Sequence, residues 1–353
     1  MEAGQVPSAT LSLRRPVGVT LGIALLSAAS VAFLGEALSR LDRVRQAIPI
    51  QSVGSGQPQL DKKLMLLDDL VRKDGPLDCV FIGSSQVHRG IDPTIFEEAF
   101  RKASGRQVRS FNFGLGGLSE TGEEPIATVL LAKFRPKMMI IGASSYGLDD
   151  ERGVTVAAHL ATNPWIQYHH GEFSFDGWLI EHSFAFRNYL GCLFLAEPRI
   201  PFKQAMVRRA VAGMSARGYG SLESGEFRGV DEAAAKILRN YSVSADHLES
   251  LSKVLRLGGD VDKLVVEVPV HESVIGLFQE GEADHQRALD AVLGVAAAQN
   301  VPFWKYPGDR PIPRNGWSDY VHLNRIGAEV YSRWLGERLG EAVRQGRVAR
   351  LAD

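Results

Sequence analysis

The sequence has little of what metal, nucleotide and disulfide sites require. Two cysteines and nine histidines occur among 353 residues, and they form no Cys-x-x-Cys or His-Glu-x-x-His pattern. Cys79 and Cys192 lie in apolar stretches, which favours small buried core residues over a disulfide. A phosphate-binding Gly-x-x-x-x-Gly-Lys-Ser/Thr is missing, and residues 114–117 lack the full dinucleotide-binding pattern. We therefore expect no metal and no cofactor.

An excess of one charge is also missing. The 40 lysines and arginines balance the 41 aspartates and glutamates, which leaves a net charge of -1. This balance argues against a nucleic-acid-binding surface. With 45% hydrophobic and 23% charged residues, the composition is that of an ordinary globular protein, and we expect one main domain with insertions.

The most distinctive polar motif lies near the C-terminus, where Asp319 and His322 are three residues apart. In such a pair the histidine can act as a general base and the aspartate can orient it, but the reaction also needs a nucleophile. Ser85 is the best candidate, because the apolar run at residues 79–82 predicts a buried strand that turns into a helix at Gly83-Ser84-Ser85. Taken alone, Asp319 is more often a helix N-cap and His322 a surface residue; the two motifs in this order favour a catalytic site.

Two further segments predict strands that end in small residues. Residues 110–117 lead into a glycine-rich loop, and residues 137–145 end in Gly142-Ala143-Ser144-Ser145. Helical stretches at 93–103 and 124–133 alternate with these strands, which indicates an α/β fold with a parallel sheet. Because the carboxyl ends of parallel strands meet at one edge, we expect their loops to form the site.

This order of segments resembles the SGNH (GDSL-like) hydrolase superfamily, specifically the membrane-anchored branch linked to O-acylation of cell-surface polymers. The resemblance implies a three-layer flavodoxin-like fold with a central parallel sheet. It also implies that Ser85 is the nucleophile and that the backbone N–H groups of Ser85 and Gly117 bind the oxyanion. The family normally has an asparagine two residues after a glycine in its third block, where this chain has Ser144. A serine hydroxyl is shorter, so Ser144 would reach the oxyanion only by closer approach or through water.

The function that the resemblance implies is that of a serine esterase or O-acyltransferase, which transfers or removes acetyl groups on a cell-surface or exported polysaccharide. A membrane-bound O-acyltransferase would be the natural acyl donor. Two alternatives stay open: a catalytically inactive glycan-binding subunit on the same fold, and a soluble lipase-like esterase. His271 follows a predicted strand at 263–268 and is either a pocket residue or an ordinary loop histidine.

The N-terminal region predicts a membrane anchor. Residues 16–34 form an uncharged run of 19 residues, long enough to span a bilayer. A cleaved signal peptide is the competing interpretation. We expect residues 1–15 to form a tail and residues 35–75 to form a stalk with a helix near 62–72. Charge counting leaves the orientation open, and the resemblance implies a domain outside the inner (cytoplasmic) membrane, facing the periplasm.

The remaining chain predicts one hydrolase-like domain at residues 76–345, followed by a tail at 346–353. Residues 146–242 interrupt the α/β rhythm and are expected to form a mostly helical insertion. Within it, His169 and His170 are adjacent and so point apart, which favours loop residues over a metal site.

Overall fold

A five-stranded sheet, with every strand parallel to its neighbours, forms the centre of the protein. The computed structural model describes residues 14–48, 50–149, 154–195, 205, 208–223, 227, 229–230, 232–348 and 350–351. The strands are β1 (Cys79–Ile82), β2 (Ser110–Asn112), β3 (Met138–Ala143), β4 (Asp262–Glu267) and β5 (Phe303–Trp304). Their order is β2-β1-β3-β4-β5. The predicted α/β fold with a parallel sheet is confirmed.

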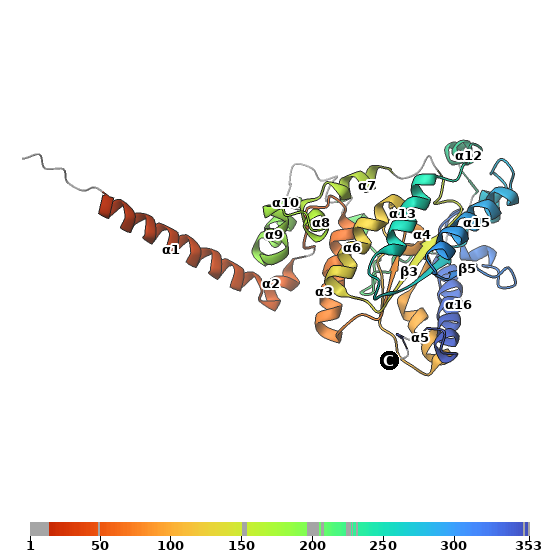
Figure 1. Ribbon diagram of the computed structural model, residues 1–353, viewed down its shortest axis with the longest axis horizontal. Coiled ribbons are helices and arrows are strands. Elements are labelled where there is room, and N and C mark those ends of the chain that lie inside the picture. The colour runs from red at the N-terminus through yellow and green to blue at the C-terminus, as the bar shows by residue number, and fades with distance from the viewer. Residues whose placement is uncertain are drawn as a thin grey trace, which may run out of the picture.

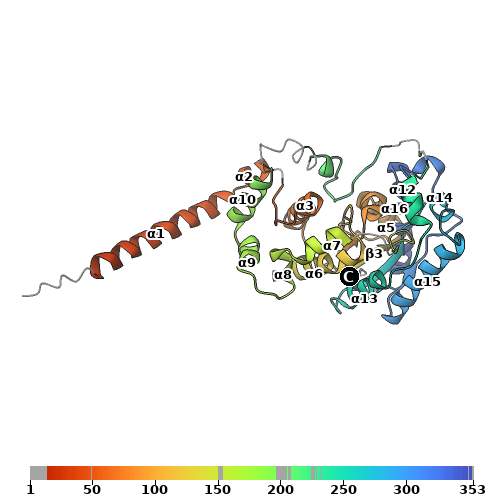
Figure 2. The ribbon, with the colours of Figure 1, turned by 90° about the horizontal axis from the view of Figure 1, so that it is seen from above.

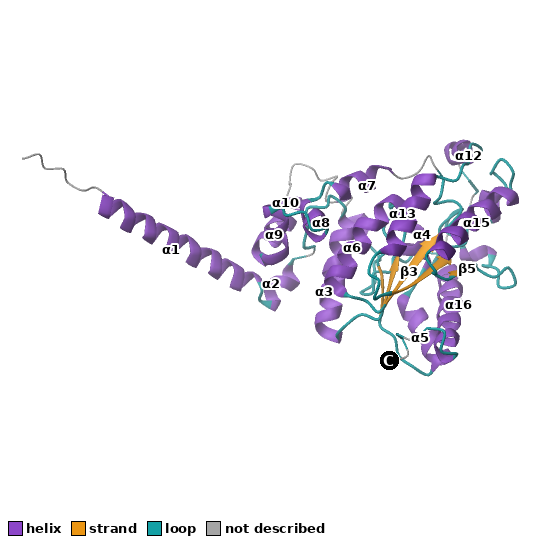
Figure 3. Cartoon of the chain, viewed as in Figure 1, coloured by secondary structure: helices purple, strands orange, loops and turns teal. Residues whose placement is uncertain are grey.

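Helices cover both faces of this sheet, as Figures 1 and 3 show. Every residue of β1, β2 and β3 is buried, which explains why β1 and β3 appear in the sequence as short apolar runs instead of alternating patterns. One face carries α4 (Ser85–Gly90), α5 (Pro93–Ser104) and α16 (Arg325–Arg344). Gly336 and Gly340 let α16 lie against α5, since a Cβ at either position would stand under 3.0 Å from the α5 backbone.

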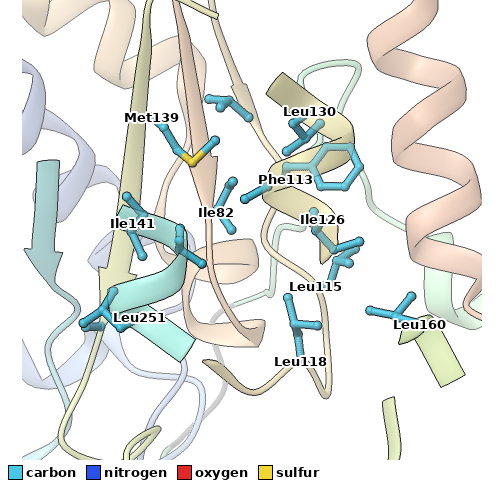
Figure 4. Close-up of a cluster of buried hydrophobic side chains, with 14 of the residues drawn as sticks. Ile82, Phe113, Leu115, Leu118, Ile126, Leu130, Met139, Ile141, Leu160 and Leu251 are labelled. Carbon is cyan, nitrogen blue, oxygen red and sulfur yellow. The ribbon is translucent and has the colours of Figure 1, made fainter. Parts of the chain in front are cut away.

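The other face carries the larger core. It is covered by α3 (Pro58–Asp74), α6 (Glu123–Phe134), α13 (Ala245–Arg256) and α15 (Glu282–Ala298). Figure 4 shows part of this core, where Ile82, Met139 and Ile141 of the sheet face Ile126 and Leu130 of α6. All five side chains are at most 2% exposed.

The insertion predicted at 146–242 is mostly helical in its described residues, with turns and an isolated bridge around 212–223. It contains α7 (Val154–Ala161), α8 (Pro164–His169), α9 (Phe175–His182), α10 (Phe184–Leu195) and α12 (Glu232–Leu238). The remaining short elements are α2 (Asp42–Ala47), α14 (Glu272–Ile275) and the 3₁₀ turns Glu120–Gly122 and Arg314–Gly316. The described part of the insertion around Arg217 lies along the edge strand β2, where the Asn112 N–H donates to the carbonyl of Arg217.

The first helix, α1 (Arg14–Ser39), leaves the globular part and contacts it only near its C-terminal end among the described residues. Its segment Val17–Ser39 is long and apolar enough to cross a membrane, and it is not buried in the structure. This is the helix that the uncharged run at 16–34 predicts, extended by several residues.

The stalk predicted at 35–75 needs correction, because much of it belongs to the domain. Leu60, Leu64 and Leu67 of α3 are at most 3% exposed and pack in the main core. Lys63, on the same side of the helix, is fully buried. The apolar spacing at positions 60, 64 and 67 is that of a helix facing a core, so α3 covers the sheet and is not a spacer.

The order of the strands reverses direction between β1 and β3. The path runs from β1 outward to β2, then returns past β1 to β3. Such a reversal leaves an opening at the carboxyl ends of the two central strands, where α/β proteins bind ligands. Ser85 follows β1 and Ser144 follows β3, so both lie at this point.

Candidate active site

Three side chains, one from the turn after β1 and two from the segment before α16, form a continuous hydrogen-bonded series. The Oγ of Ser85 lies 2.7 Å from Nε2 of His322, and Nδ1 of His322 lies 2.7 Å from Oδ2 of Asp319. Asp319 also accepts the N–H groups of Val321 and His322 through Oδ1, which fixes the carboxylate in a tight turn. Burial raises the pKa of Asp319, but these hydrogen bonds from His322 and the backbone outweigh it and hold the pKa below its usual value.

This geometry is that of a serine activated by an oriented base. The pair precedes α16 instead of opening it, because Asn324 is the N-cap of that helix. Asp319 therefore stabilises the turn that carries His322 and does not cap α16. Ser85 is the first residue of α4, and Ser84 caps that helix through its hydroxyl.

The turn that presents Ser85 depends on three glycines at three strand ends. Gly83 has φ +153°, and a Cβ there would lie 2.3 Å from Val87 Cγ2. A Cβ at Gly142 would lie equally close to the same methyl group, and one at Gly114 would lie 2.4 Å from the His88 N–H nitrogen. The absence of side chains at these positions lets α4 lie directly on the carboxyl edge of the sheet.

Two backbone N–H groups are candidates for binding an oxyanion. The loop after β2 lies beside the nucleophile turn, since the Leu115 N–H donates to the Gly83 carbonyl at 2.9 Å. Within this loop Gly114 and Gly116 donate to side chains, whereas the N–H of Gly117 has no protein acceptor within the described part of the chain. The same holds for the Ser85 N–H at the start of α4, where helices leave such donors unpaired.

Ser144, the third predicted oxyanion residue, donates its hydroxyl proton elsewhere. Its Oγ lies 2.6 Å from Oε1 of Gln86 and accepts the Gly147 N–H. The Gln86 amide in turn donates to the Val321 carbonyl at 3.3 Å. Ser144 therefore connects β3 to the histidine turn through Gln86, and the only proton of its hydroxyl is engaged in this contact.

A buried lysine of α3, which the sequence analysis does not predict, holds the glycine-rich loop after β2 by hydrogen bonds. The Nζ of Lys63 donates to the carbonyls of Asn112 and Gly114, at 2.8 and 2.5 Å. Burial lowers its pKa well below the usual value, and nearby Arg89 acts in the same direction. Position 63 falls on the apolar stripe of α3, so the signal that could have found it is a charged residue at a core position.

Gln57, the N-cap of α3, and the first turn of that helix hold the same loop. Gln59 accepts the Gly116 N–H at 2.7 Å, and Gln57 donates to the Gly116 carbonyl at 3.2 Å. Asp61 fixes this segment, because its fully buried carboxylate accepts hydrogen bonds from Ser52 and Ser55. The loop that carries Gly117 is therefore braced at several points.

Asp61 gives a testable pH dependence. Burial raises its pKa to about 6 from 3.8, against hydrogen bonds from Ser52, Val53 and Ser55 that lower it. Between pH 3.8 and about 6 the Asp61 carboxyl keeps its proton in the folded protein but has lost it in the unfolded chain. The free energy of unfolding therefore falls as the pH rises between these two values. A shift of about 2 units corresponds to about 3 kcal/mol. Asp61→Asn keeps the shape and an acceptor oxygen, and we expect it to remove this loss.

The measurement is urea unfolding of wild type and Asp61→Asn in detergent at several pH values from about 4 to 7. The variant should gain stability relative to wild type as the pH rises. Parallel pH profiles for the two proteins would contradict the assignment.

A cavity of about 500 Å³ lies on the other side of the histidine turn. His271 and Trp317 form part of its wall, and the His271 N–H donates to the carbonyl of Tyr320, between Asp319 and His322. The His271 side chain caps α14 and lies edge-on to Trp317. The cavity and the triad therefore share one loop, while His271 itself is not part of the triad.

His285 and Glu267 bring polar groups to the same cavity. His285 bonds Ser145 through Nδ1 at 2.8 Å, and its Nε2 lies 3.7 Å from the Glu267 carboxylate. Burial lowers the pKa of His285 and raises that of Glu267. Both side chains line the cavity and are nearly buried.

Two histidines of the insertion, His169 and His170, contact acidic side chains outside the triad. His169 contacts Glu181 at 3.1 Å, and His170 lies 3.9 Å from Glu124. Across the described ranges of the chain, no three histidine, cysteine, aspartate or glutamate side chains form a metal-binding group. Cys79 is a free thiol buried in β1, whereas the side chain of Cys192 lies outside the described residues.

Comparison with models of known protein families gives no match to this chain, and comparison with curated protein sequences gives none either. The chemical interpretation therefore depends on the arrangement of the residues themselves.

Proposed function

We propose that the protein is a membrane-anchored serine esterase or O-acyltransferase with an SGNH-type, flavodoxin-like fold, acting outside the cytoplasmic membrane on a cell-surface or exported polysaccharide. The observation that carries the proposal is the series Ser85–His322–Asp319, with both hydrogen bonds at 2.7 Å. Its place at the reversal of the strand order supports the same conclusion.

The reaction has two halves. His322 takes the Ser85 proton as Oγ attacks the acyl carbonyl, and the negative charge that develops on the carbonyl oxygen meets the N–H groups of Ser85 and Gly117. The bond to the leaving group then breaks, the leaving group takes the proton from His322, and an acyl-Ser85 ester remains. In the second half a sugar hydroxyl or water gives its proton to His322 and attacks the ester carbonyl, the bond to Ser85 Oγ breaks, and His322 returns the proton to Oγ.

Two features of the structure bear on the rate of the reaction and on its acceptor. The hydroxyl of Ser144 is engaged with Gln86, so a third oxyanion donor is missing from this position, and the loss of one donor typically costs about 10² to 10³ in turnover. The cavity beside the histidine turn has carboxylate, imidazole and aromatic groups that suit a polyhydroxylated acceptor. We propose that acetyl is carried on Ser85, with a membrane-bound O-acyltransferase as the donor and the polysaccharide as the acceptor.

The first test is covalent labelling of the full-length protein with a fluorophosphonate. An activated serine attacks the phosphorus and displaces fluoride, so intact-mass measurement should give a single adduct, and peptide mapping should place it on Ser85. Labelling that occurs at no serine of the folded protein would overturn the proposal. It would then favour a glycan-binding subunit without catalytic activity.

A second assay separates transfer from removal. An activated aryl acetate supplies the acyl group, and candidate oligosaccharides compete with water for it. Acetylated sugar in the products indicates a transferase, whereas free acetate alone indicates an esterase.

A further inference from the structure

The end of α1 is held to the insertion by a specific set of contacts. Glu36 accepts the N–H groups of Phe184 and Ala185, at 2.8 and 3.1 Å, and the hydroxyl of Ser183 at 3.0 Å. These donors lie at the start of α10, where a carboxylate is favoured by the helix dipole. Arg40 joins the contact by donating to Glu36 and to the His182 carbonyl. The anchor helix therefore has a fixed direction relative to α9 and α10.

All but one of the large apolar side chains that are exposed outside Val17–Ser39 gather at this junction. Seven such residues occur among those described: Leu41, Val44, Phe173, Phe175, Trp178, Tyr189 and Leu293. All but Leu293 belong to α2, α9, α10 or the residues directly before α2 and α9. Figures 1 and 2 show these elements beside the domain end of α1 in both views. We call the six residues the junction patch.

The chemistry of the junction patch is that of a bilayer interface. Phe173 and Phe175 are 78% and 62% exposed, and Trp178 stacks on Phe175 at 6.1 Å between ring centroids. Tryptophan and tyrosine are enriched where lipid headgroups meet the acyl chains. The exposed side chains of Arg40 and Arg43 follow the apolar segment directly, where they can meet lipid phosphates while their stems cover apolar surface.

We propose that the junction patch lies in the headgroup region of the same bilayer that α1 crosses, so that the domain is seated on the membrane and not held away from it. This inference rests on the proposed anchor and is independent of the chemistry at Ser85. Because the Glu36 contact fixes α1 beside the patch, the bilayer surface at the end of the span is the surface that the patch meets.

The test uses the full-length protein in nanodiscs whose phosphatidylcholine is brominated near the top of the acyl chains. Bromine quenches only the tryptophans that it touches. Five tryptophans are present, and only Trp178 lies in the junction patch, so we expect the emission to fall by up to about one fifth relative to plain lipid. In Trp178→Phe this quenching should disappear, while the matched control Trp304→Phe should retain it.

Circular dichroism and co-elution with the nanodisc verify folding and insertion of each variant. Inserted, folded wild type whose Trp178 is not quenched would overturn the seating and would assign the patch to a protein partner. Failure to insert would instead count against the anchor, and with it the seating. Fluorophosphonate labelling of the same samples reports on Ser85 separately.

Discussion

Ser85→Ala and His322→Ala are each expected to lower acyl turnover by about 10³ to 10⁶. Alanine at 85 removes the hydroxyl that lies 2.7 Å from His322 Nε2, so no acyl-enzyme can form. Alanine at 322 leaves the hydroxyl without a base, and a serine hydroxyl is a poor nucleophile at neutral pH. Because the two residues act on one proton, the double variant should be no slower than either single variant.

Hydrolysis of an activated aryl acetate measures this loss, and intact mass shows whether acetyl remains on the protein. Ser84→Ala is the matched control, because its hydroxyl lies one residue away but caps α4 through the Gln86 N–H. This variant should lose stability of about 1 kcal/mol and keep most of its turnover. Activity that survives in Ser85→Ala but not in Ser84→Ala would reassign the nucleophile.

Much of the fold follows from local sequence patterns. The apolar runs near 79–82 and 138–143 are short and flanked by turn residues, and both are buried strands with the predicted direction. Helices such as α5 begin at Asp92-Pro93, a capping residue followed by proline, and the structure has Asp92 capping the Thr94 N–H. In these segments local preference and tertiary packing agree.

The triad was accessible from the sequence for a related reason. Asp319 and His322 interact within one turn, so their spacing alone carries the information. Ser85 is located by the strand and glycine before it. Only the long-range step, which brings residues 237 positions apart to 2.7 Å, needed the assumption that carboxyl ends of parallel strands share an edge.

The supporting contacts were not accessible in this way. Lys63 and Asp61 are charged residue types in a segment expected to be a stalk. Only their contacts in the folded protein show that Lys63 holds the glycine loop and that Asp61 holds the segment at Ser52 and Ser55. Ser144 was assigned from its position after β3, but its direction depends on Gln86, a residue on another element. Interactions between side chains of distant segments have no signature in a single sequence.

Asp319→Asn is expected to reduce turnover by about 10² to 10⁴, with little change in folding. In wild type, Oδ1 accepts the N–H groups of Val321 and His322, and Oδ2 faces Nδ1 of the histidine. If the asparagine oxygen keeps the two backbone contacts, its amide group faces Nδ1. That nitrogen must then be the acceptor, the ring proton moves to Nε2, and Nε2 can no longer take the proton of Ser85.

The aspartate side chain is 41% exposed, and for this reason we expect a loss below that seen when such a carboxylate is fully buried. Water can solvate part of the charge that forms on His322 and replace some of its effect. The rate constant for fluorophosphonate labelling should fall in parallel with acetate turnover, because both reactions need the same proton transfer. Unfolding by urea should distinguish a tautomer effect from loss of the turn, since Asp319→Ala also removes the acceptor for two backbone N–H groups. If Asp319→Asn reacts within a few-fold of wild type, the orientation of His322 comes from its packing and not from the carboxylate.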